Sequence, residues 1–85
     1  MEKHIIIGIH LTGRVDQATH VQKIFTEYGC NIKTRLGLHE TGTDYCAPSG
    51  VILLEMIGDE EDTDTMMNKL NSMHGIEVKK MTFVN

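Results

Sequence analysis

The sequence predicts an α+β domain in which four strands form one antiparallel sheet and two helices cover one of its faces. Two observations lead to this prediction. An apolar strand-like run, an amphipathic stretch closed by glycine and a second strand-like run fill residues 4–39, and the same order returns over residues 49–84. The chain has 85 residues, so a strand–helix–strand unit that occurs twice indicates one small domain, residues 1–85.

The first half predicts a strand, a helix and a second strand. Isoleucine recurs at alternate positions within residues 4–11, which is typical of a strand with one face under the helices. Apolar residues then recur at intervals of three and four over residues 15–28, which predicts an amphipathic helix. Gly29 follows this helix, and we expect it to end the helix in the left-handed backbone conformation.

Polar and apolar residues alternate over residues 31–39, which predicts a half-buried strand. The face expected toward the helices carries Ile32, Thr34, Leu36 and Leu38. The opposite, open face of the sheet is then expected to carry Lys33, Arg35 and His39.

The second half repeats the pattern after a polar loop over residues 40–48. Residues 51–57 form a strand run that is apolar on both faces. The acidic run at 59–62 suits a helix N-terminus, where the helix dipole favours negative charge. Gly75 is expected to close this helix, and residues 76–84 form the last strand. The buried stripe predicted for the second helix comprises Met66, Met67, Leu70 and Met73.

This order of elements, with right-handed crossovers, is that of a ferredoxin-like βαββαβ sandwich, in which the first and third strands are central. Because the third strand is apolar on both faces, it and Ile6 would leave an apolar patch on the face without helices. Monomers seldom expose contiguous apolar patches of more than a few hundred Å². We therefore expect a homodimer or homotetramer to cover the open face. The alternative is that the loop over residues 40–48 folds across it.

Composition and motifs narrow the classes of function. The net charge of −4 argues against a direct nucleic-acid surface, which needs a basic stripe. Two cysteines, no signal-peptide pattern and no long apolar run favour a cytoplasmic protein that does not enter a membrane. The chain lacks a Gly-x-Ser-x-Gly, phosphate-loop or Cys-x-x-Cys motif, so we do not expect an enzyme. The remaining enzymatic alternative is a small oligomeric enzyme with its site at a subunit interface.

Three segments carry a resemblance to a known family. Residues 28–32 (Tyr-Gly-Cys-Asn-Ile) resemble the helix-to-strand junction of ACT domains, which are small regulatory modules that often bind amino acids at subunit interfaces. Residues 32–37 (Ile-Lys-Thr-Arg-Leu-Gly) and 73–79 (Met-His-Gly-Ile-Glu-Val-Lys) are similar to short stand-alone regulators of the iron-only hydrogenase system. That family in turn resembles the ligand-sensing domain of nickel-responsive repressors.

The resemblance implies a regulatory or sensory protein that self-associates and responds to a small ligand or a protein partner, in transcription- or hydrogenase-related regulation. It identifies neither the ligand nor a cofactor. One segment departs from the ACT pattern, because the first turn is Thr12-Gly13-Arg14 where ACT domains usually carry Asp-x-Pro-Gly. Gly13 corresponds to the glycine of that motif.

Basic residues suggest a ligand site, and histidine with cysteine suggests a metal site as the alternative. Gly13 and Arg14 at the start of the first helix, with Arg35, are the candidate contacts for an anionic ligand. A metal-responsive module would use His39 and Cys46 at a subunit interface, since imidazole and thiolate suit nickel, zinc or copper.

Overall fold

The computed structural model describes residues 3–12, 15–39 and 50–84, except the side chains of residues 15–18, 38 and 39. The elements are, in chain order, β1 (Lys3–Leu11), α1 (Val15–Glu27), the 3-10 helix η1 (Gly29–Asn31), β2 (Ile32–His39), β3 (Gly50–Met56), α2 (Glu60–Asn71) and β4 (Ile76–Val84). The four strands form one sheet in the order β2-β3-β1-β4, and every neighbouring pair is antiparallel.

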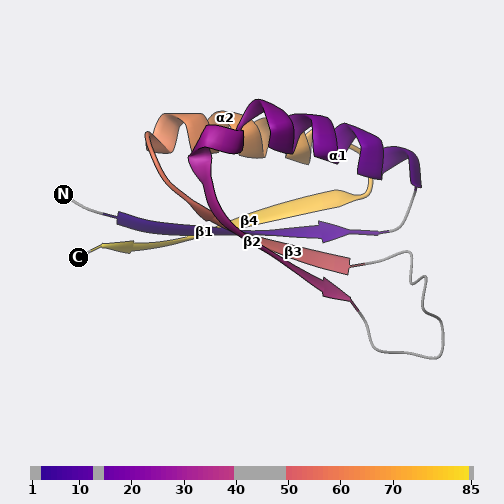
Figure 1. Ribbon diagram of the computed structural model, residues 1–85. Coiled ribbons are helices and arrows are strands. Elements are labelled where there is room, and N and C mark those ends of the chain that lie inside the picture. Colours follow the sequence, from indigo (N-terminus) through magenta and orange to yellow (C-terminus); the bar gives the residue numbers. More distant parts are fainter. Residues whose placement is uncertain (1–2, 13–14, 40–49, 85) are drawn as a thin grey trace.

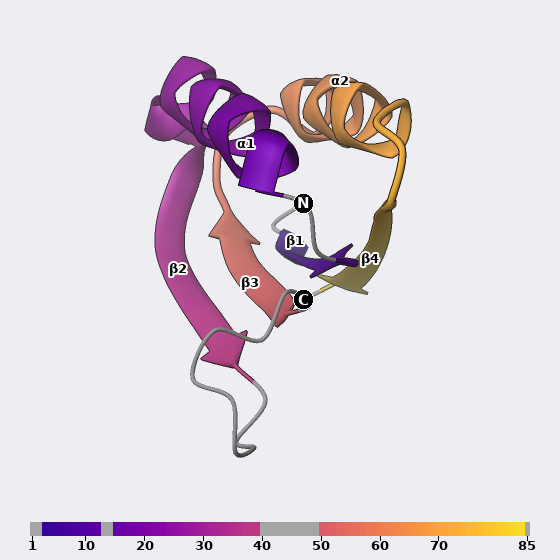
Figure 2. The same cartoon turned by 90° about the vertical axis from the view of Figure 1, so that its right-hand side faces the viewer.

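Both helices lie on the same face of the sheet, and the opposite face carries no helix (Figures 1 and 2). This is the ferredoxin-like α+β arrangement that the sequence predicts, with β1 and β3 in the centre. No helix in the described part of the chain is long and apolar enough to cross a membrane.

The core lies between the sheet and the two helices. Its members alternate along β1, β3 and β4 and recur at helical spacing along α1 and α2, so each element buries one apolar face. Thr63 is the buried polar residue among them, with 1% of its surface exposed. The buried apolar residues are Ile5, Ile7, Ile9, Val21, Phe25, Leu54, Met56, Met66, Leu70, Ile76 and Val78.

Strand β2 differs from the prediction because it contains a bulge. Ile32 is paired with Met56, whereas Thr34 is paired with the adjacent Glu55, so Lys33 is an extra residue in the ladder. A bulge of this kind reverses which alternate residues face each side of a sheet. The predicted facing of the strand is therefore wrong beyond Ile32: Thr34 and Leu36 face the open side, and Arg35 faces helix α1.

The two glycines that were expected to end the helices lie elsewhere in the structure. Gly75 has a φ of +81°, but α2 ends at Asn71 with Ser72 as its C-cap. Gly75 therefore turns the chain into β4, and the prediction that it closes α2 is wrong. The corresponding prediction for Gly29 is also wrong, because Gly29 begins the 3-10 helix η1 and its φ is not positive. Asn31, at the end of η1, accepts a hydrogen bond at its carbonyl from the Ile57 amide at 2.8 Å. This tight turn and its link to the chain after β3 fix how β2 enters the sheet.

The open face of the sheet carries an apolar stripe that runs diagonally from β4 to β2. Cross-strand pairing places neighbouring members in register, as for Ile6 beside Met81 and Leu36 beside Leu53. Gly8 lies at the middle of the stripe, and a Cβ built on it would lie 3.6 Å from Leu53 Cδ2. We call this set the open-face stripe: Ile6, Leu36, Val51, Leu53, Met81 and Phe83.

Candidate functional site

Of the ligand site that the sequence suggests, the structure describes Arg35. Gly13 and Arg14 lie outside the described residues. Arg35 lies against α1, with Nη1 3.3 Å from Gln22 Oε1 and its guanidinium carbon 4.9 Å from the centre of the Phe25 ring. The prediction that Arg35 belongs to an open-face cluster is therefore wrong, because the bulge turns it toward the helix.

The side chains of the predicted metal pair, His39 and Cys46, lie outside the described part of the chain. The backbone of His39 pairs with Gly50 at the end of β2, whereas the whole of Cys46 is outside the described part. Within the described residues, no three histidine, cysteine, aspartate or glutamate side chains come together in a way that could hold a metal ion.

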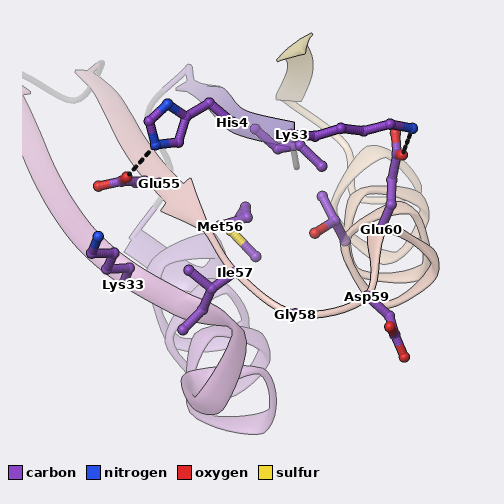
Figure 3. Close-up of a pocket in the computed structure, with 11 residues that line it drawn as sticks. Lys3, His4, Lys33, Glu55, Met56, Ile57, Gly58, Asp59 and Glu60 are labelled. Atoms are coloured by element: carbon purple, nitrogen blue, oxygen red, sulfur yellow. Dashed lines mark hydrogen bonds and ion pairs between the residues drawn. The ribbon is translucent and has the colours of Figure 1, made fainter. Parts of the chain in front are cut away.

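A groove lies at the opposite end of the sheet. It lies where β1 begins, where β3 passes into α2 and where β2 bulges, and it has a volume of about 540 Å³. This volume is within the range of small-molecule sites. Its lining residues, drawn in Figure 3, are Lys3, His4, Ile5, Lys33, Glu55, Met56, Ile57, Gly58, Asp59, Glu60 and Thr63.

One wall of the groove is built around Glu55 of β3. Thr34 Oγ1 donates a hydrogen bond to Glu55 Oε1 at 3.0 Å, and His4 Nε2 lies 3.6 Å from Glu55 Oε2. The three residues come from β2, β3 and β1 and lie at the edge of the open face. Because of the bulge, Thr34 and not Arg35 is the residue of β2 paired with Glu55.

The opposite wall is fixed by Glu60, the first residue of α2. Its two carboxylate oxygens accept hydrogen bonds from Lys3 Nζ and Lys80 Nζ, each at 2.8 Å. Lys80 Nζ also lies 2.7 Å from Asp64 Oδ1. The hydrogen bond from Lys3, and then the one from Lys80, lower the pKa of Glu60 to about 2. Glu60 is therefore a carboxylate with both oxygens occupied, and this network attaches the start of α2 to β1 and β4.

The floor is shaped by the turn between β3 and α2. Gly58 has a φ of +87°, and a Cβ added there would lie 2.8 Å from Asn31 Nδ2. The Asn31 amide uses this space to donate a hydrogen bond to the Ile57 carbonyl at 3.2 Å. Ile57 is 45% exposed and, with the buried Met56, gives the groove an apolar part.

Lys33, Asp59 and Thr63 are polar residues of the groove whose side chains have no partner among the described residues. Asp59, at the N-cap of α2, makes no side-chain capping hydrogen bond, and Figure 3 shows it directed away from Lys33. Lys33 is the extra residue of the β2 bulge, and Figure 3 shows it beside Ile57 on the side of the groove away from Glu60. Thr63 is buried on α2 and lines the groove. No hydrogen bond or ion pair joins any of these three side chains to another residue in the described ranges.

The sequence did not identify this groove, although part of its signal was present. Glu55 interrupts an otherwise apolar strand run, and Thr63 precedes Met66 and Leu70 by three and seven residues, which places it on their buried stripe. A threonine at a core position of a helix is a detectable departure from the pattern. The contribution of Lys33 depends on the bulge, which alternation alone does not reveal.

Comparison with known proteins supports the fold. No family model and no curated protein matches the chain. The structure is similar to the solved structure of an uncharacterized protein from Thermotoga maritima, with a TM-score of 0.83 and 20% sequence identity. The likeness covers 98% of this chain and 100% of that chain. At this identity it shows the fold alone, so the ferredoxin-like prediction is confirmed, whereas the resemblance to regulators of the iron-only hydrogenase system stays a prediction.

Proposed function

We propose that this chain is a small cytoplasmic regulatory protein that self-associates through the open face of its sheet and responds to a small ligand or partner. The observation that carries the proposal is the open-face stripe. Leu36, Met81 and Phe83 are 52%, 53% and 54% exposed, respectively. Large apolar side chains that are half exposed and contiguous mark an interaction surface in a soluble protein.

The polar residues on each side of the stripe favour a second copy of the chain as its partner. Lys79 lies on one side, next to Gly8, and Glu55 lies on the other, next to Ile6. Two copies related by a two-fold axis along the stripe would bring Lys79 of each copy to the side of the other that carries Glu55. Lys79 has no ion pair with any residue in the described ranges, so it is available for this contact. Such a self-complementary patch is what a two-fold interface requires.

The regulatory part of the proposal is supported by the sequence resemblance to ACT domains and to regulators of the iron-only hydrogenase system. Self-association would supply two states with different exposure of the open face. A ligand that binds one of these states more tightly would shift the balance between them.

The test is the molar mass of the protein in solution, measured by light scattering and native mass spectrometry across a dilution series. We expect wild type to form a dimer or tetramer and Met81→Lys to be monomeric. Val84→Lys is the matched control. Val84 is on the same strand and is 57% exposed, but it is adjacent to Phe83 in the strand and therefore faces the helix side of the sheet. A monomeric wild type, or equal effects of both substitutions, would contradict the proposal.

A further inference from the structure

We propose that the groove between β1, β3 and α2 binds a small organic carboxylate with a short aliphatic chain. This inference deepens the proposed function and rests on it, because it names the class of ligand to which the self-associating protein would respond. It is carried by two polar groups that have no partner among the described residues, Thr63 and Lys33, and by the apolar surface of the groove.

The Thr63 hydroxyl is in an unusual position for a helical threonine. Thr26 and Thr65 each donate a hydrogen bond to the carbonyl four residues earlier, at 2.9 Å. Thr63 makes no such bond to a described residue, although only 1% of its surface is exposed. A buried hydroxyl without a hydrogen bond is costly for the folded protein. Because Thr63 lines the groove, a polar group bound there could accept this hydrogen bond.

The Lys33 ammonium supplies the positive charge. Three other lysines, Lys3, Lys69 and Lys80, each form an ion pair at 2.7–2.8 Å with an acidic side chain. Lys33 forms none with a described residue and instead lines the groove. Bulges often re-aim a side chain next to a functional site, and Lys33 is the extra residue of the β2 bulge.

The acidic residues in the walls do not favour a cationic ligand instead. Glu60 is neutralised by two lysines, and Glu55 accepts the Thr34 hydroxyl and lies beside His4. Asp59 also lines the groove, but Figure 3 shows its side chain directed away from Lys33. What the interior of the groove offers a ligand is one ammonium, one hydroxyl and the apolar surface of Ile57 and Met56. A carboxylate attached to a short alkyl chain satisfies all three.

The position of the groove connects binding to self-association. Its His4 and Glu55 lie beside the open-face stripe, since His4 pairs with Phe83 and Glu55 with Ile6. A carboxylate held by Lys33 adds negative charge next to Glu55, on the side that Lys79 of a second copy would approach. Binding and association are therefore expected to strengthen each other.

The experiment is a calorimetric and NMR titration of the full chain with 4-methylpentanoate. We expect saturable binding, with amide shifts centred on residues 55–63. Lys33→Gln and Thr63→Val are each expected to weaken binding about tenfold, the size of one charged or buried hydrogen bond. The matched controls are Lys23→Gln and Thr65→Val, which alter an exposed lysine of α1 and an exposed threonine of α2 and should leave the Kd unchanged. Thr63→Val should unfold no more easily than wild type, which separates lost binding from lost folding.

A second arm uses leucine, which adds an ammonium group to the same chain. We expect leucine to bind no more tightly than 4-methylpentanoate. If leucine bound more than about tenfold more tightly than 4-methylpentanoate, and Glu55→Gln removed this difference in affinity, the ligand would be a zwitterion and the carboxylate assignment would be overturned.

Measuring molar mass in the same samples keeps the two proposals separable. An oligomer that binds no carboxylate, or binds it with the Kd of wild type after Lys33→Gln and Thr63→Val, overturns the groove proposal and leaves self-association standing. A monomer that binds 4-methylpentanoate in a Lys33- and Thr63-dependent way supports the groove site and overturns the proposed self-association.

Discussion

The two edge strands of the sheet have similar sequence patterns and different roles. In β4, Ile76 and Val78 alternate with polar residues and are both buried under α2. Strand β2 also alternates apolar and polar residues, but none of its described side chains is fully buried. Its Leu36 is 52% exposed and lies on the open face of the sheet. The difference is one inserted residue, Lys33. An alternating pattern therefore predicts a strand with two unlike faces, but the ladder decides which face is buried.

The largest expected effect is on the free energy of unfolding, when one aliphatic residue from each edge strand is truncated to alanine. Ile76→Ala removes a buried side chain and is expected to lower the free energy of unfolding by about 2–4 kcal/mol. Leu36→Ala truncates an exposed side chain and should cost less than about 1 kcal/mol. Both are compared by urea unfolding in a Met81→Lys background, so that self-association does not add to the result. Equal losses at the two edges would show that β2 contributes to the core as β4 does.

The second prediction concerns the ion network that joins β4 to α2. Since the folded-state pKa of Glu60 is lowered from 4.5 to about 2, its stabilising effect is complete above the ordinary pKa. That effect is lost as the pH falls from about 4.5 to about 2. The melting temperature of wild type should therefore fall more steeply over this range than that of Glu60→Gln.

Glu77→Gln is the control for this acid titration, because Glu77 is an exposed acid on β4 that takes no part in the network. The melting temperature of Glu77→Gln should fall with pH as steeply as that of wild type. Parallel melting curves for wild type and Glu60→Gln would mean that the carboxylate of Glu60 does not hold α2 in place.

A smaller effect is expected from deleting Lys33. The deletion joins Ile32 directly to Thr34 and makes the β2–β3 ladder regular without changing which residues face each side. We expect the fold to persist, with a change in the free energy of unfolding within about 1 kcal/mol, and carboxylate binding to be lost. Chemical denaturation and nuclear Overhauser contacts between Arg35 and Phe25 provide the measurement. Loss of those contacts would show that the bulge is needed to set the facing of β2.

The smallest effect is expected from Arg35→Ala. The guanidinium lies over Phe25 and near Gln22, and an exposed contact of this kind contributes about 0.5–1 kcal/mol. Lys79→Ala, on the open face of β4, should change the stability of the monomer by less than that. A loss of several kcal/mol on Arg35→Ala would instead make β2 as important to the core as β4.

The fold was predictable from sequence because its elements carry strong periodic patterns. The last strand was predicted over residues 76–84, as the structure has it, and Gly75, directly before it, has the positive φ that glycine tolerates. These features depend on local alternation and on the backbone freedom of glycine, which single sequences record well.

The candidate site was less predictable because it depends on tertiary register. The alternation of Ile32, Thr34 and Leu36 is the same whether or not Lys33 is extra, so it cannot reveal the bulge. The hydrogen bonds between Asn31 and Ile57 that set the entry of β2 join residues 26 positions apart. Such contacts form only in the folded chain, and so Lys33 and Thr63 could not be brought to one groove by inspection of the sequence.

The pairing of Lys3 with Val84 has a consequence for protein engineering. The first and last described residues lie on adjacent strands at the same end of the molecule (Figure 1), separated by about the 5 Å spacing of neighbouring strands. A short glycine-rich connection could therefore join the two ends without distorting the sheet, and the chain could be reopened between β2 and β3. A circular permutant of that kind would begin with β3 and end with β2 while keeping the β1–β4 ladder intact.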